Sequence, residues 1–438
     1  MLRRLGPSVV RVADAPAGEL FPAKLMFNPP AHGPWNIVHM GMLVPEAHQI
    51  YVCAVNCLRG VVLTAAEMGA SDRFSCVVLK EEDVVRGTVE QVTLEGIADV
   101  LHKLEARGVL PPCVIVFPVC THHFLGVPMS RVYRALRDRF PGVDFVEAYM
   151  DPIMNRRLSP DVRLRKVMYD PLEPQPADEQ LVAVLGSDFS IDADSDLRSV
   201  LAAGGYGLVD VRGCETYAEF KAMGAAGTFL SVYPNAAYGA QKVARRLGRR
   251  HLYLPSCFQY DEIAREHADL REALGLPVLD EVSEVASCEE ELAVTLAVLG
   301  DAPIAIDSSA HPRPLGLARL LLEHGFRVTE VYLDAVGDEE RTALAWLCDH
   351  APDVQLSSIV LPDLRVAQRE REERTLAIGQ KAAWFCGTPY FVNMVEGAGL
   401  WGYAGVRTVA RLMRQAWETP KDTRDLIPRK GLGCPGCL

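Results

Sequence analysis

Short apolar runs alternate with segments of helical periodicity along almost the whole chain of 438 residues, and this alternation limits the fold more than any other feature. Strands separated by about 10 to 20 residues of helical pattern indicate parallel sheets with crossover helices. We therefore predict an α/β protein. In the first third of the chain the apolar runs lie at 48–54, 74–79, 113–119 and 143–149, and the helical patterns at 58–68, 88–107 and 129–139.

Two further sets of the same kind follow. A Pro-rich stretch at 170–180, DPLEPQPADEQ, separates the first set from a second one whose strands begin near 181, and a third set begins near 302 with APIAIDSS. Three sets predict three Rossmann-like, doubly wound parallel-sheet domains around a central cleft. We place these domains at 1–177, which carries the candidate metal ligands, at 178–298, and at 299–438, which ends in a helix and a CxxC tail.

Charge and apolar content restrict the class of protein further. The 45 basic and 57 acidic residues give a net charge of -12, which argues against a nucleic-acid partner. The first residues contain two arginines but no apolar core of the length that a secretory signal needs. The longest apolar stretch, at 51–68, is interrupted by Asn56, Arg59 and Glu67, so we expect no membrane association. We predict a cytoplasmic protein, in which twelve cysteines serve as thiols or metal ligands more readily than as disulfides.

Three cysteines stand where apolar runs end. Cys53 and Cys57 lie between an apolar run and a helical pattern, and Cys120 ends another apolar run. If the two strand ends are neighbours, the three thiolates converge, and soft thiolate sites select zinc, cuprous copper or iron-sulfur clusters. Core packing is the alternative, because free cysteine is among the most buried residue types. His122 and His123 follow Cys120, either as solvated loop residues or as proton donors or ligands.

Glycines near the carboxyl end form a second motif. Gly397, Gly399 and Gly402 spell G-x-G-x-x-G between an apolar run and a helical pattern. A dinucleotide fingerprint needs a following strand with an acidic residue, and none follows here, so a glycine turn over an interdomain cavity is favoured over NAD binding. No G-x-x-x-x-G-K-[ST] motif occurs, so we expect no ATP hydrolysis by this chain itself. The tail holds a C-x2-C pair, Cys434 and Cys437, as half of a metal site or as mobile thiols.

The order of several motifs resembles the nitrogenase component 1 family over almost the whole chain. His48 stands five residues before Cys53, EEDVVRGTVEQVTLEGI follows at 81–97, Cys120 stands in VIVFPVCTHHFLG, and GYAGVRTVARLM begins at Gly402. Each motif is similar to one that the family shows in the same order. The resemblance implies a component 1 type oxidoreductase with three α/β domains.

The departures from the family pattern are equally informative. The family's first cluster cysteine would fall near Phe27, so Cys57 would replace it. The ligands of the molybdenum-iron cofactor would fall near Val232 and Val392, which cannot bind a metal, so the resemblance implies neither that cofactor nor reduction of dinitrogen.

What remains implies a reductase subunit with an iron-sulfur cluster, expected to be four-iron four-sulfur, on Cys53, Cys57 and Cys120. The fourth ligand would come from a second subunit, His48, His122 or a tail cysteine. Electrons would arrive from an ATP-dependent iron-sulfur reductase protein, protons would come from His122 or His123, and a homologous or identical subunit would complete the oligomer. A scaffold for metallocluster assembly is the alternative function, and a cluster-free binding protein is a third.

Overall fold

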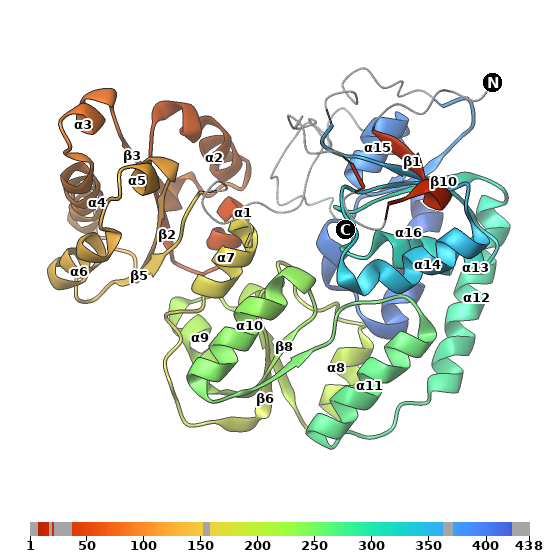
Figure 1. Cartoon of the computed structure of the whole chain (residues 1–438). Helices are drawn as coiled ribbons and strands as arrows, with labels where there is room; N and C mark the ends of the chain where they lie inside the picture. Colours follow the sequence, from red (N-terminus) through yellow and green to blue (C-terminus); the bar gives the residue numbers. More distant parts are fainter. Residues whose placement is uncertain (1–7, 17–19, 22–36, 152–157, 362–370, 423–438) are drawn as a thin grey trace.

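The structure is a computed structural model that describes residues 8–16, 20–21, 37–151, 158–361 and 371–422. It consists of three lobes, each built around its own sheet (Figure 1). The predicted α/β class with three parallel sheets is confirmed. Within the described residues, none of the helices combines the length and apolar character that a bilayer crossing requires.

The first lobe holds a four-stranded parallel sheet in the order β3-β2-β4-β5. All residues of β2 and β4 are buried, as expected for central strands covered by helices on both faces. Tyr51 and Cys53 of β2 face the core that contains α2, whereas Ile50 and Val52 face the core beneath α4 and α6. The elements are α1 (Ile37–Met42), β2 (His48–Cys53), α2 (Val55–Glu67), β3 (Phe74–Val78), α3 (Glu81–Val85), α4 (Val89–Ala106), β4 (Cys113–Pro118), α5 (Cys120–Phe124), α6 (Met129–Arg139), β5 (Asp144–Glu147) and α7 (Pro160–Val167).

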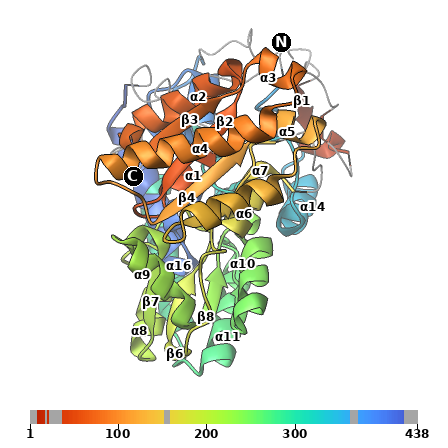
Figure 2. The ribbon, with the colours of Figure 1, turned by 90° about the vertical axis from the view of Figure 1, so that its left-hand side faces the viewer.

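The second lobe repeats this plan with the strand order β7-β6-β8-β9, all parallel. Helix α7 of the first lobe packs against α10 of the second, so the two lobes share one hydrophobic core (Figure 2). The elements are β6 (Asp178–Val184), α8 (Asp196–Ala203), β7 (Gly207–Asp210), α9 (Tyr217–Ala222), β8 (Ala226–Ser231), α10 (Pro234–Leu247), β9 (Arg250–Tyr253) and α11 (Tyr260–Leu274).

The third lobe contains a six-stranded sheet in the order β1-β12-β11-β10-β13-β14. Its strands are parallel except for β1, which pairs antiparallel with β12. Helix α16 packs along α12 and also contacts α8 of the second lobe. The elements are β1 (Val9–Arg11), α12 (Glu281–Leu299), β10 (Pro303–Asp307), α13 (Pro314–Glu323), β11 (Arg327–Tyr332), α14 (Arg341–His350), β12 (Gln355–Ser357), β13 (Leu376–Ile378), α15 (Gln380–Cys386), β14 (Phe391–Val392) and α16 (Gly402–Glu418).

Two strands of the third sheet, β1 and β13, could not be recognised from the sequence pattern. Strands β1 and β13 are each three residues long, too short for alternation or an apolar run to stand out. Figure 1 shows β1, in red, inside the blue third lobe. A division by sheets therefore assigns residues 9–11 to the third lobe, although the first domain was predicted to begin at residue 1. The other domain limits and the central cleft stay predictions.

Candidate functional site

The predicted thiol ligands follow two neighbouring parallel strands. Cys53 is the last residue of β2, and Cys120 opens α5 directly beyond β4. The pairing of Val52 with Pro118 sets both strand ends at the same edge of the first sheet. Ligand sites of open α/β sheets lie at this carboxyl edge. The expectation that the two strand ends are neighbours is thus correct.

Cys53 is a buried thiol whose neighbours are also thiols. Burial, and then the nearby thiols of Cys57 and Cys76, raise the pKa of Cys53 to about 12. Cys57 lies in the first turn of α2 and is exposed. The Cys53 thiol therefore keeps its proton at neutral pH unless a metal replaces it, because a thiolate here would be buried beside other developing charges.

Cys76 also belongs to this group of thiols, although it was not among the predicted ligands. It pairs with Tyr51 across β2 and β3, and paired residues share a face of the sheet, so Cys76 lies on the face that carries Tyr51 and Cys53. Cys120 is half-buried at the end of the next strand, and it is not among the groups that shift the Cys53 pKa. The different positions of Cys76 and Cys120 relative to Cys53 follow from the strand register and not from their spacing in the sequence.

No complete site for a single metal ion is present in the described part of the chain, since no three His, Cys, Asp or Glu side chains are grouped as its ligands. The structure brings Cys53 and Cys57 together and places Cys120 on the same edge of the sheet. The counterpart near Phe27 and the tail cysteines Cys434 and Cys437 lie outside the described residues.

His48 was a candidate fourth ligand, and this prediction is wrong. It begins β2 whereas Cys53 ends it, and five residues of strand span about 16 Å. The His48 ring bonds the Ser75 hydroxyl at 2.8 Å, and burial lowers its pKa to about 4. His48 thus lies at the opposite edge of the sheet from the thiols.

His122 is a buried structural histidine in the present geometry. Its Nδ1 accepts a hydrogen bond from the Val119 amide at 3.2 Å, and its Nε2 lies 3.0 Å from the Thr93 hydroxyl. Thr93 donates its own proton to the Val89 carbonyl, so His122 Nε2 is the donor in this pair. Burial lowers the His122 pKa to about 4. Because both nitrogens are used internally, the proton-donor prediction for this edge depends on His123.

His123 has a different environment. Its side chain is 30 % exposed, and its Nδ1 forms a short hydrogen bond with the carboxylate of Asp151, whose side chain is fully buried. Asp151 follows Met150, which bridges to Val119 at the end of β4. Asp151 was not among the predicted site residues, although it stands two positions after the apolar run at 143–149 that contains β5. A polar residue at a strand end was the signal that could have revealed it.

The three glycines of the G-x-G-x-x-G motif make close protein contacts. All have positive φ, and a Cβ on Gly399 would overlap the Ser190 carbonyl oxygen, while one on Gly402 would overlap the Asp196 carboxylate. Gly397 packs against the His311 ring. The turn thus lies where the third lobe meets the second, as expected for an interdomain turn, and the cavity beneath it stays a prediction. A cofactor role for these glycines stays a prediction.

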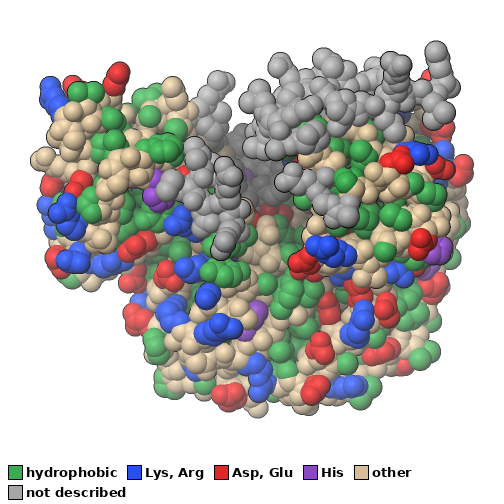
Figure 3. Space-filling view, in the orientation of Figure 1, with side chains coloured by type: hydrophobic (Ala, Val, Ile, Leu, Met, Phe, Trp, Pro, Cys, Tyr) green, Lys and Arg blue, Asp and Glu red, His purple; other side chains and the backbone are tan. Residues whose placement is uncertain are grey.

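Exposed apolar side chains follow the strands whose ends form the thiol edge of the first sheet. Val55 begins α2, Val85 ends α3, and Phe124 and Leu125 close α5, so they follow three neighbouring strands. Their exposed fractions are 65, 80, 67 and 45 %. We call these four residues the apolar collar. On the face shown in Figure 3, basic side chains lie among acidic ones, so this face carries no patch of a single charge.

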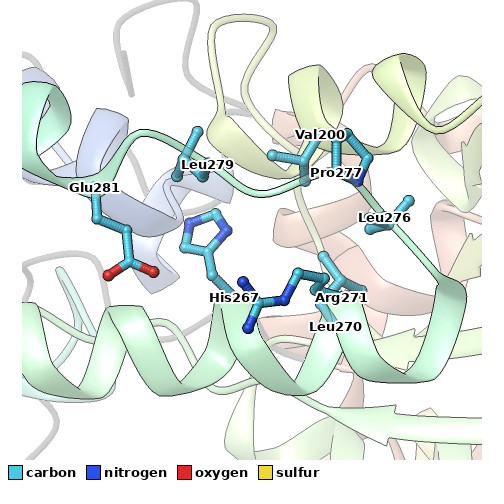
Figure 4. Close-up of a pocket in the computed structure, with 8 residues that line it drawn as sticks. All are labelled: Val200, His267, Leu270, Arg271, Leu276, Pro277, Leu279 and Glu281. Carbon is cyan, nitrogen blue, oxygen red and sulfur yellow. The ribbon is translucent and has the colours of Figure 1, made fainter.

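A small pocket lies far from the thiols, between α11 and the chain that enters α12 (Figure 4). His267 of α11 points toward Leu279, and Glu281 stands at the start of α12. The cavity volume is about 10 Å³, room for roughly one water molecule. This pocket is too small for an organic substrate.

Comparison with known proteins agrees with the architecture. No protein-family model matches the chain, and no curated protein matches its sequence. A structure titled nitrogenase Cp1 at pH 6.5 superposes on 91 % of this chain and 94 % of its own, with a TM-score of 0.66.

The chain has the nitrogenase component 1 fold. A second structure of nitrogenase Cp1, at pH 5, covers 94 % of this chain and 93 % of its own with a TM-score of 0.60. Sequence identities are 14 % and 11 %, so these matches establish the fold, and the chemistry has to be argued from the residues.

Proposed function

We propose that the chain is a nitrogenase-like component 1 reductase subunit. It would hold an iron-sulfur cluster and pass electrons from an ATP-dependent iron-sulfur protein to an unidentified substrate. The observation that carries this proposal is the position of Cys53, Cys57 and Cys120 on one carboxyl edge of the first lobe, in a nitrogenase component 1 fold. When bound, a cluster supplies one-electron transfer at a potential that its surroundings tune.

The donor set fits part of a cluster site. Thiolates are the ligands that iron-sulfur clusters use, and a cluster needs about four. Cys53 would be the buried ligand. It follows Tyr51, whose ring stacks on that of Phe117 with centroids 4.4 Å apart, and both rings are fully buried. Cys57 and Cys120 are accessible at the same edge.

The apolar collar supports a second subunit as the source of the remaining ligand. Contiguous exposed apolar residues around a site mark surfaces that a partner covers. The collar residues follow the same strand ends as Cys57 and Cys120, so a homologous or identical subunit that covered the collar would also bury those thiols. Removal of water from this edge would favour electron transfer over side reactions.

Metal analysis of anaerobically prepared protein tests the proposal. The wild-type chain with its partner subunit should contain iron and acid-labile sulfide. Cys53→Ser should lose most of both, and the exposed Cys348→Ser serves as the matched control that should lose neither. The pair Cys120→Ser and Cys76→Ser decides which thiol completes the set. Wild-type protein without iron, or Cys53→Ser with full iron, would refute the proposal.

Assembly of a metallocluster for another protein is the second candidate. The exposure of Cys57 favours it, because a cluster on an accessible thiol can pass to an acceptor by ligand exchange. The kinetics discriminate between the two functions. With the ATP-dependent reductase present, a reductase subunit gives sustained substrate consumption, whereas a scaffold gives one transfer of iron to an acceptor protein.

A further inference from the structure

Three side chains, each with a polar group that no described residue bonds, lie in contact beyond the carboxyl end of β5. The His123 ring stacks on the Tyr149 ring with centroids 5.6 Å apart and planes inclined by 18°. The Arg163 guanidinium lies over the same Tyr149 ring, 4.4 Å from its centroid. They come from α5, from the chain after β5, and from α7, so folding rather than local sequence brings them together.

Asp151 fixes the proton arrangement of His123. A carboxylate only accepts hydrogen bonds, so His123 Nδ1 must carry the proton of their shared hydrogen bond. Because the Asp151 side chain is fully buried, this partner cannot turn away into solvent. The free nitrogen is then Nε2, and among the described residues no hydrogen bond to it is present. His123 therefore offers Nε2 to a ligand from a fixed ring position.

The cation available to an anion beside His123 is Arg163, because the Asp151 carboxylate is taken up by its bond with His123. Within the described ranges Arg163 forms no ion pair, and its contact there is with the face of Tyr149. The nearby acid Glu147 is already paired with Arg137 at 3.0 Å. Arg163 is half-buried, which strengthens its attraction for an anion compared with a fully solvated arginine. Guanidinium groups bind carboxylates in a bidentate fork.

We propose that Arg163, Tyr149 and His123 form a binding site for a carboxylate-bearing organic ligand, with Asp151 as the positioning residue of a proton-transferring His123. This inference rests on the proposed reductase function only for the direction of proton transfer. Arg163 binds the carboxylate, and the Tyr149 ring forms one wall of the site.

The proton balance of the step is simple. Imidazolium at His123 releases its Nε2 proton, and the electron pair of that N–H bond stays on the nitrogen. Reduction of one substrate double bond takes two electrons, which the iron-sulfur reductase partner delivers one at a time, and two protons. His123 supplies the proton of one new bond, and water supplies the other. Nδ1 keeps its proton toward Asp151, and water afterwards restores the proton on Nε2. No other co-reactant is needed.

Acylation by diethyl pyrocarbonate tests the site without any need for reductase activity. The reagent attacks an accessible neutral imidazole nitrogen, and peptide mass spectrometry of the full-length chain reads the rate at His123. We expect His123 to react at least tenfold faster than buried His122. Asp151→Asn should slow the reaction several-fold, because the asparagine no longer holds Nε2 as the free, electron-rich nitrogen.

Protection by a simple carboxylate tests the ligand class. Sodium propionate should slow acylation of His123 at least threefold in the wild type and leave it unchanged in Arg163→Gln. Propionamide, the neutral isostere, should give no protection. Equal protection by both compounds, or protection that survives in Arg163→Gln, would overturn the anion site. Circular dichroism of each variant verifies its fold, and Arg163→Lys, which keeps the charge, should retain part of the protection.

The same data separate this inference from the proposed function. Acylation rates are measured on iron-free protein, so a chain without a cluster can still show the positioned histidine and the anion site. Conversely, equal acylation rates of His123 in the wild type and in Asp151→Asn would refute the positioning role of Asp151, even if the protein proves to be a reductase.

Discussion

Replacing Arg165 by methionine should weaken the contact between all three lobes. Arg165 lies in α7 of the first lobe, with a side chain that is 1 % exposed. Its guanidinium bonds both carboxylate oxygens of Asp188, at 2.9 and 2.7 Å, and reaches Glu396 of the third lobe at 3.2 Å. It also donates to the Gly186 carbonyl and lies over the Tyr233 ring. One cation thus neutralises two buried acids from different lobes.

The magnitude follows from what the substitution leaves behind. Methionine fills a similar volume but leaves the buried Asp188 carboxylate without its cation and removes the cation from Glu396. Breaking a buried ion pair from one side costs about 3–5 kcal/mol. The unfolding entropy of a 438-residue chain is about 0.9 kcal/mol per kelvin. Arg165→Met should therefore lower the midpoint of cooperative thermal unfolding by about 3–5 °C.

Thermal unfolding followed by circular dichroism at pH 7.5 measures this effect. Lys103→Met is the matched control, because it removes a cation from an exposed pair with Asp99 and should cost less than about 1 kcal/mol. Adding Asp188→Asn to Arg165→Met should restore part of the loss, since one stranded charge disappears. A midpoint for Arg165→Met within 1 °C of the control, or no recovery in the double variant, would refute the electrostatic explanation.

Three further outcomes follow from single contacts. Burial lowers the pKa of His122 to about 4, so between pH 6.5 and 4 the unfolded chain takes up a proton that the native state does not. The free energy of unfolding therefore falls as the pH falls. His122→Gln should reduce the slope of the thermal unfolding midpoint against pH. Gly399→Ala should cost about 3 kcal/mol or more, because its Cβ meets a carbonyl oxygen at φ +75°, whereas Gly248→Ala at φ +66° in open space should cost about 1–2 kcal/mol. Val85→Asp and Phe124→Asp should reduce the mass of the oligomer in light scattering.

A specific result would refute each of these three predictions. A midpoint that changes with pH equally in His122→Gln and the wild type would mean that other groups control the acid response. Equal losses for the two glycine variants would leave backbone strain alone as the cause. An unchanged oligomer mass for both aspartate variants would exclude the apolar collar from the subunit contact.

The architecture was largely accessible from the sequence, and the reason is local. Side-chain periodicity reports whether a segment is strand or helix, because it depends on backbone geometry over a few residues. The runs at 48–54 and 113–119 became β2 and β4, and the helical patterns between them became α2 and α4. The end of β2 could also be predicted from the sequence, so Cys53 was correctly assigned to a strand end.

Relations between distant segments were not accessible in this way. Strand register, rather than spacing along the chain, placed Cys76 on the face of Cys53 and left Cys120 at the neighbouring strand end. His48 resembled a partner of Cys53 in sequence, yet a strand separates residues by about 3.3 Å each, so it reached the opposite edge.

The sequence by itself determined that this chain forms α/β units of parallel strands and where each strand presents its terminal residues. Only the tertiary structure decided that Asp151 orients His123 and that Arg165 meets Glu396, 231 residues away. The periodicity of apolar side chains follows from hydrogen bonding and sterics between near neighbours, so a short stretch of sequence is enough to show it. A polar pair across lobes forms because a buried charge needs a partner of opposite charge, and that condition exists only after the lobes have packed.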